Sequence, residues 1–116
     1  MNITIKPSFL SGSVHIPSSK SMTHRMLICA ALADGISVID GVDFSKDITA
    51  TIEAMKSLGA IIRTNGNSVT VRGIAVPSLN ASINCFESGS TLRFLIPVAA
   101  ALGTETIFLG EGRLPK

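Results

Sequence analysis

An internal repeat constrains the fold of this chain more than any other feature of its sequence. Arg25 opens the apolar stretch RMLICAALA, and Arg93, 68 residues later, opens the similar stretch RFLIPVAAAL. Each stretch runs into a glycine, then a strand-like segment and then another glycine. Repeats of solenoid proteins have shorter periods, of about 20–50 residues. The sequence therefore predicts a duplicated α/β unit.

The order of the expected elements leads to the same interpretation. Strand-like segments alternate with apolar helices, and Asn65-Gly66-Asn67 between two of them is a strong hairpin signal. The predicted fold class is α/β (or α+β), with repeated β-α-β-α-β-β units, of which the chain holds one full unit and the start of a second. The expected strands are residues 2–5, 13–16, 36–42, 60–64, 68–72, 82–86 and 105–109.

Three helices are expected between these strands. The first contains residues 26–33 and is predicted to be buried, because it is apolar on nearly every side. Ser45 is a suitable N-cap for the second helix, and Asp47 in its first turn suits the helix dipole. Gly59 is the expected end of that helix, whose core-facing residues at helical spacing are Ile48, Ile52 and Met55.

The composition is typical of one globular domain and excludes several functions. The chain has 116 residues, of which 46% are hydrophobic and 16% charged, with a net charge of +2 and few aromatics. These values argue against nucleic-acid binding. No apolar run approaches the roughly 20 residues that span a bilayer, and residues 1–10 lack the apolar core of a signal peptide. We expect a cytoplasmic protein without a nucleic-acid or membrane partner.

The cysteines and histidines form no metal-binding motif. Cys29 and Cys85 each lie among apolar neighbours, so both are predicted to be buried free thiols. His15 and His24 have no ligand partners at metal spacing. The sequence therefore predicts no metal site.

The strongest polar cluster lies at the head of the first helix, where residues 18–25 read SSKSMTHR. Free N–H groups and the dipole at a helix N-terminus attract phosphate or carboxylate. Lys20 adds a point charge, Arg25 adds a planar fork that suits carboxylates, and Ser21 shares a face with Arg25. Cations at a helix start oppose the dipole. An anion site is therefore favoured over the alternative, a solvated cap.

Two further clusters carry weaker signals. Residues 87–93 read ESGSTLR, in which Gly89 permits close approach of a ligand to the backbone and Arg93 follows four residues later. Residues 110–116 read GEGRLPK and contain Arg113. Taken alone, the first is equally well explained by a Gly-Ser turn with an exposed arginine, and the second is better explained by a basic turn.

The three segments together resemble a known family. SKSMTHRMLICAALADG is similar to the opening signature of enolpyruvylshikimate-phosphate synthases, ESGSTLRF resembles their second signature, and GEGRLPK resembles their third. All three occur in the right order, so the chain is identified as the N-terminal part of a member of this enolpyruvyl transferase family. One departure is Glu87-Ser88, where many members carry Asn-Ala, and it leaves sensitivity to glyphosate open.

The resemblance implies a shikimate-pathway transferase of aromatic amino-acid biosynthesis. Such an enzyme joins the enolpyruvyl group of phosphoenolpyruvate to shikimate 3-phosphate, releases phosphate and uses no metal or organic cofactor. The resemblance also implies two similar domains, each with three β-α-β-α-β-β units, and an active site between them. Residues 1–15 would belong to the other domain and residues 16–116 to the N-terminal domain. The full-length enzyme is expected to be a monomer.

The resemblance assigns roles to individual residues of the first signature. Lys20 corresponds to a lysine that touches both substrates, and it is the catalytic candidate of this chain. Ser21 and Arg25 correspond to residues that bind shikimate 3-phosphate.

The other signatures add candidates on the phosphoenolpyruvate side. Gly89 corresponds to a glycine that lines the phosphoenolpyruvate pocket, where glyphosate also binds, and Arg113 corresponds to an arginine on phosphoenolpyruvate. Arg93 and Asp47 match positions near the site, without a defined role.

Two alternatives remain open on the sequence. A UDP-N-acetylglucosamine enolpyruvyl transferase would carry Lys-Asn-Ala at the first helix head, where this chain has Lys20-Ser21-Met22. It would also carry a reactive cysteine in a mobile loop. A non-catalytic anion-binding or assembly module is the second alternative. Because family enzymes are several times longer and carry their acid/base carboxylates beyond Lys116, we expect the chain alone to be inactive.

Overall fold

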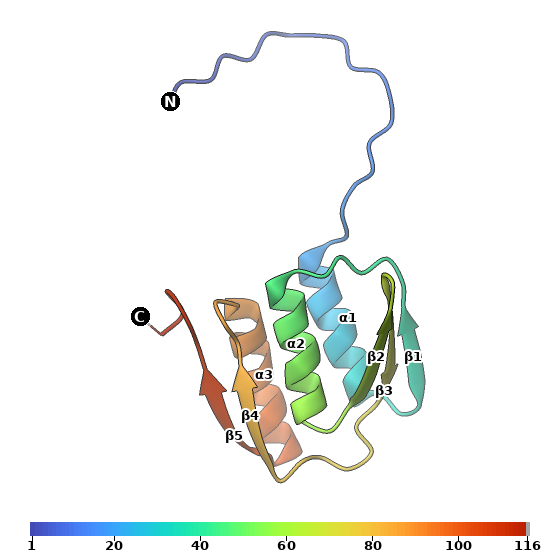
Figure 1. Cartoon of the computed structure of the whole chain (residues 1–116), viewed down its shortest axis with the longest axis vertical. Helices are drawn as coiled ribbons and strands as arrows, with labels where there is room; N and C mark the ends of the chain where they lie inside the picture. Colours follow the sequence, from blue (N-terminus) through green and yellow to red (C-terminus); the bar gives the residue numbers. More distant parts are fainter. Residues whose placement is uncertain (116) are drawn as a thin grey trace.

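The computed structural model describes residues 1–115, in which three helices and five strands follow one another from Lys20 onward (Figure 1). The elements are α1 (Lys20–Leu32), β1 (Ile36–Ile39), α2 (Lys46–Ser57), β2 (Ile61–Asn65), β3 (Ser68–Arg72), β4 (Asn80–Asn84), α3 (Gly89–Leu102) and β5 (Glu105–Leu109).

The helices lie between two sheets (Figure 1). One sheet has the order β1-β3-β2 and is antiparallel throughout; the other is the parallel pair β4-β5. β2 and β3 form the predicted hairpin, and Gly66 in its turn has a φ of 57°, a left-handed conformation that favours glycine. The order β4-α3-β5 starts the α/β arrangement a second time, so the predicted duplication is confirmed.

A serine caps the N-terminus of every helix in the described chain. Ser19, Ser45 and Ser88 each accept a hydrogen bond from the backbone amide three residues further on. The prediction for α2 is confirmed: Asp47 lies in its first turn, and Ile48, Ile52 and Met55 are buried. The amphipathic pattern of this helix therefore determines which face it turns to the core.

The core fills the space between the helices and the inner faces of the two sheets. Burying one such side chain contributes about 1.5–3 kcal/mol relative to leaving it exposed. Its members come from α1, α2, α3 and strands of both sheets, which unites the chain from α1 onward into one packed body. Fully buried representatives are Leu27, Met55, Leu58, Val69, Val71, Ile83 and Leu95.

The opening strands predicted at residues 2–5 and 13–16 are absent from the structure. Residues 1–17 form no helix or strand, their side chains are exposed, and the segment extends away from the body (Figure 1). Ordering a backbone costs about 1–2 kcal/mol per residue, and a strand without a sheet neighbour regains none of it. The segment joins the body at Ser18, whose hydrogen bonds hold the pKa of Asp43 below its usual value.

Three smaller predictions also need correction. Cys29 is exposed rather than buried, because one side of α1 is left open and also carries exposed Met22 and Met26. Cys85 is buried as predicted, and burial raises the pKa of its thiol. β1 is shorter than predicted, and β4 begins two residues earlier, because the parallel register with β5 determines its ends.

Candidate functional site

The predicted site residues lie at one end of the molecule. The chain direction in Figure 1 shows that α1, α2 and α3 all begin at the same end, and β4 and β5 both finish there. Three helix N-termini with free N–H groups thus share one side of the protein. The predicted residues at or near this end are Lys20, Ser21 and Arg25 on α1, Asp47 on α2, Gly89 and Arg93 on α3, and Arg113 after β5.

Lys20 and Asp47 link the heads of α1 and α2. Lys20 Nζ lies 2.6 Å from Asp47 Oδ2, and both side chains are partly accessible, at 57% and 29%. An accessible pair of this kind contributes about 0–1 kcal/mol to stability. Its consequence is geometric: the carboxylate fixes the position of the ammonium group between two helix N-termini.

Ser21 and Arg25 share a face of α1, as predicted, and they are in direct contact. Arg25 Nη1 donates a hydrogen bond to Ser21 O at 2.9 Å and another to Ser21 Oγ. The guanidinium also lies over the ring of Phe94 on α3, 5.1 Å from its centroid, which is a cation–π geometry. Arg25 is therefore held between α1 and α3 while it remains exposed.

Gly89 is the first residue of α3 and has open space beside it. A Cβ at this position would meet only Leu114 Cδ1, at 4.0 Å, which is an ordinary contact. Alanine would therefore fit here without disturbing the described chain. Arg93 is exposed one helical turn further along α3.

The loop of Arg113 lies against the start of α3 because β4 and β5 are parallel neighbours. Cys85 N donates to Leu109 O, and Glu111 N donates to Phe86 O at 2.7 Å. Glu87 Oε1 accepts from Arg113 N at 3.4 Å. The Glu87 carboxylate is thus turned toward the Arg113 loop, so the second and third motifs form one structural unit.

Sequence reasoning missed a chain of buried polar side chains that crosses all three helices. His24 Nδ1 lies 2.7 Å from Thr51 Oγ1, Thr51 Oγ1 lies 2.9 Å from Thr91 Oγ1, and Thr91 Oγ1 lies 2.7 Å from Ser88 Oγ. All four residues are buried. Polar residues on otherwise apolar helix faces were the available signal: Thr51 falls between the buried Ile48 and Met55.

The surroundings of His24 favour its neutral form. Burial lowers the pKa of the imidazole below its usual value, Asp47 opposes this effect, and Lys20 and Arg25 reinforce it. Nε2 has no hydrogen-bond partner within the described residues, so a charged ring would carry an unpaired N–H. No group of three metal-ligating side chains gathers in residues 1–115.

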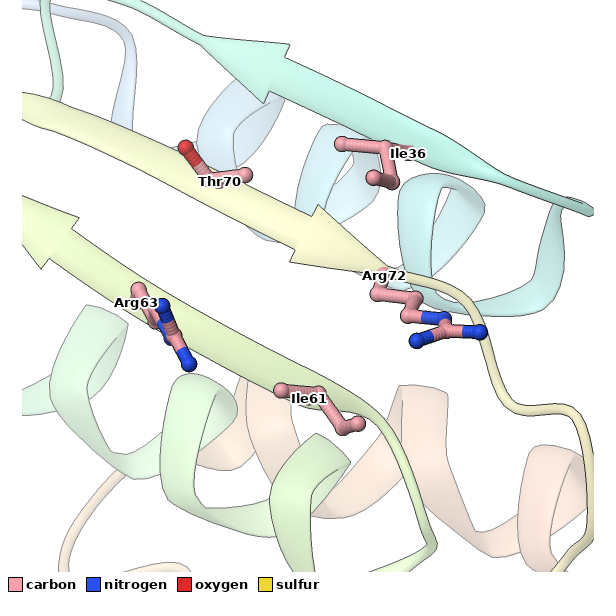
Figure 2. A pocket seen from close by; sticks show the side chains of 5 residues that line it. All are labelled: Ile36, Ile61, Arg63, Thr70 and Arg72. Carbon is pink, nitrogen blue, oxygen red and sulfur yellow. The ribbon is translucent and has the colours of Figure 1, made fainter.

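One hollow of the surface lies away from these residues. Figure 2 shows it on the outer face of the three-stranded sheet, away from the helices; its volume is about 250 Å³, and its lining is Ile36, Ile61, Arg63, Thr70 and Arg72. None of the predicted site residues lines it. In the described part of the chain, α1, α2 and α3 are each too short or too polar to cross a bilayer.

The geometry defines a class of protein: an α/β repeat unit that carries Lys20, Arg25 and a glycine at clustered helix N-termini. Family comparison agrees with this class. The model of the family EPSP synthase (3-phosphoshikimate 1-carboxyvinyltransferase) matches residues 5–116, and the chain belongs to this family.

Similar proteins carry the same family name. The chain is 54% identical over 113 residues to the 3-phosphoshikimate 1-carboxyvinyltransferase of Clostridium kluyveri and 50% identical over 123 residues to that of Clostridium beijerinckii. The matches cover 97% and 99% of this chain but 26% and 28% of the relatives. The chain thus spans about a quarter of their length.

A solved structure shares the fold. The EPSP synthase from Acinetobacter baumannii superimposes with a TM-score of 0.74 at 24% identity, over 90% of this chain and 25% of that chain. The predicted fold class, the repeated unit of enolpyruvyl transferases, is therefore confirmed.

Proposed function

We propose that this chain supplies one wall of the active site of a 3-phosphoshikimate 1-carboxyvinyltransferase. The enzyme moves the enolpyruvyl group of phosphoenolpyruvate to shikimate 3-phosphate, releases phosphate and acts in the shikimate pathway. The observation that carries the proposal is the gathering of the family's three signatures at the shared end of α1, α2 and α3.

The reaction explains why cations are needed at this end. The substrate hydroxyl oxygen loses its proton and adds to the phosphate-bearing carbon of phosphoenolpyruvate, while the methylene carbon gains a proton; the phosphate then leaves and the new methyl group loses a proton, which gives the enol ether product. Both substrates are anions, so positive groups must neutralise them and hold them in reacting geometry. In the proposal, Lys20 contacts both substrates, and Ser21 and Arg25 bind shikimate 3-phosphate.

We assign the phosphoenolpyruvate side of the active site to the N-terminus of α3 and to the loop that follows β5. Gly89 lines the pocket, Arg113 binds phosphoenolpyruvate, and Arg93 and Asp47 support the site from its edge. Support comes from the hydrogen bond of Glu87 to the Arg113 amide, which keeps the two motifs together. Asp47 acts by holding the Lys20 ammonium in position.

The proposal also includes a division between domains. Residues 16–116 belong to the N-terminal domain and residues 1–15 to the other domain of the enzyme. The exposed apolar side chains Ile3, Ile5, Phe9 and Leu10 support this division, because they would be buried against a second body. A cytoplasmic, monomeric enzyme acting on small molecules completes the proposal.

A phosphate-release assay tests this function. The natural full-length protein, incubated with phosphoenolpyruvate and shikimate 3-phosphate, should release phosphate only when both are present. Replacing shikimate 3-phosphate by UDP-N-acetylglucosamine distinguishes the related transferase and should give no release. The chain of residues 1–116, assayed in parallel, should be inactive because it lacks the opposite wall that excludes water. The assignment would be refuted if the full-length protein released phosphate from phosphoenolpyruvate with UDP-N-acetylglucosamine as the only acceptor, or with no acceptor at all.

A further inference from the structure

The hydroxyl of Thr91 lies between the heads of α3 and α2. Thr91 is fully buried, and Oγ1 contacts Ser88 Oγ at 2.7 Å, Thr51 Oγ1 at 2.9 Å and Asp47 O at 3.4 Å. The first contact lies within the head of α3, and the other two reach α2. A single hydroxyl thus joins the cap of one helix to the first turn and the middle of another.

Two routes continue from α2 to α1. The carboxylate of Asp47 pairs with Lys20, and Thr51 contacts His24 Nδ1 at 2.7 Å. The first route is partly accessible to solvent, whereas the second is buried. Thr91 therefore has a continuous polar connection to the helix that carries Lys20 and Arg25.

Each side chain in this buried network can donate and accept only a few hydrogen bonds. A threonine or serine hydroxyl has one proton and two lone pairs, and a neutral imidazole has one donor and one acceptor. His24 Nδ1 can therefore donate to or accept from Thr51, and the hydroxyls can orient accordingly. Removing the hydroxyl of Thr91 takes one of two buried partners from Thr51, which keeps His24 Nδ1, and one of two from Ser88, which keeps the Thr91 amide. The hydrogen-bonding capacity left unused in the interior favours rearrangement of both helix heads.

We propose that Thr91 is a positioning residue that sets the distance between Gly89 on α3 and Lys20 on α1. The inference rests on the proposed function, because the distance between Gly89 and Lys20 affects the reaction rate only if both residues lie in the active site. Gly89 is two residues from Thr91, and Lys20 is held by Asp47, whose backbone carbonyl faces the Thr91 hydroxyl. A misplacement of about 1 Å in such a site can cost about a hundredfold in rate.

The test compares two substitutions in the natural full-length protein. Thr91→Val keeps the branched shape and removes the hydroxyl, whereas Thr91→Ser keeps the hydroxyl. We expect T91V to raise the KM for phosphoenolpyruvate about tenfold and to lower kcat about tenfold. T91S should stay within about twofold of the unmodified enzyme; both expectations follow from the positional sensitivity of such sites.

Thr104→Val is the matched control. Thr104 is also buried, but its Oγ1 has no hydrogen-bond partner among residues 1–115. T104V should therefore leave both kinetic constants unchanged. Kinetics of T91V that match those of T104V would overturn the proposal.

A second measurement does not depend on activity. Amide hydrogen exchange in residues 22–28 of α1 should accelerate in T91V and remain unchanged in T104V, although both substitutions lie outside α1. Acceleration confined to α3 would refute the connection, even if the protein released no phosphate and the proposed function failed. If T91V does not fold, Thr51→Val breaks the same connection at α2 and must give the same pattern of exchange and kinetics.

Discussion

The heads of α1 and α3 share a local frame but carry different chemistry. Ser19 and Ser88 cap them through amides three residues further on, at 3.4 Å and 3.1 Å. The head of α1 is exposed and carries Lys20 in an accessible ion pair. The head of α3 has no cation before Arg93; it begins with Gly89 and has a buried serine and threonine instead.

This difference shows what the duplication retained. The serine cap and the apolar helix occur in both copies, so they serve the fold of the unit. Lys20 and Gly89 occupy the first helical position of their copies. In the proposed site, one copy therefore provides charge and the other provides space beside the backbone.

The largest effect should come from the charge of the first head. Lys20→Met keeps the length of the side chain and removes the ammonium group, so transition-state stabilisation should fall by about 3–4 kcal/mol in the full-length enzyme. Steady-state kinetics with both substrates measure this loss. Lys46→Met is the control, because Lys46 is also the first residue of its helix. Equal, small effects of the two substitutions would remove the distinction between the heads.

A substitution at the head of α3 should change the affinity for substrate. Gly89→Ala should raise the KM for phosphoenolpyruvate about tenfold and weaken glyphosate inhibition, because a methyl group occupies space that the ligand needs. The midpoint of thermal unfolding should stay the same, since a Cβ meets only Leu114 at 4.0 Å. Ser90→Ala, at an exposed neighbouring position, controls for changes in the helix start. Unchanged substrate and inhibitor constants in G89A would reduce Gly89 to a turn residue.

The buried, hydrogen-bonded side chains between the heads of α1 and α3 should make the free energy of unfolding depend on pH. The pKa of His24 is lowered in the folded state, so the unfolded chain binds the proton more readily. The free energy of unfolding should therefore decrease as the pH falls below the unfolded value, about 6.5. Urea titrations between about pH 7.5 and pH 5 measure this decrease.

His24→Gln should flatten that profile, whereas His15→Gln should leave it unchanged, because His15 lies in the exposed opening segment. A profile that H24Q does not alter would mean that other groups govern the pH dependence. The buried side chains between the heads of α1 and α3 would then have no detectable role in the pH dependence of stability.

The smallest effect concerns the segment before the first head. Residues 1–15 of the chain should show no protection from hydrogen exchange, because they form no helix or strand and expose their side chains. Residues 20–32 of α1 serve as the internal reference. Protection of residues 1–15 that equals that of α1 in a monomer would contradict the exposed arrangement; a dimer would indicate strand pairing between copies.

Local signals predicted most of the body. Asn65-Gly66-Asn67 determined the hairpin, and Ser45 with Asp47 determined the start of α2, because turns and caps depend on a few neighbouring residues. The opening strands were wrong because a strand needs a neighbour that lies elsewhere in sequence. Cys29 was wrong because the open side of α1 depends on which partners pack against it.

The sequence named candidate site residues and did not reveal the contacts between the helices that carry them. Lys20, Arg25 and Gly89 follow from the helix-head chemistry and the family signatures. In our proposal, their relative positions depend on the contact of Thr91 with Thr51, two residues 40 positions apart in the chain. No local pattern reports such a contact, so it emerges only from the packing of α2 against α3.

The common direction of α1, α2 and α3 gives the molecule an electrical polarity. Each helix N-terminus carries about half a positive charge, and three of them add at one end together with Arg25, while the Asp47 carboxylate offsets the charge of Lys20 there. Such a field acts on an anion before contact, over a screening length of about 8 Å at physiological ionic strength. Encounter with a phosphorylated substrate should therefore be fastest in dilute buffer and slow with added salt, while the bound geometry, set by short contacts, changes little.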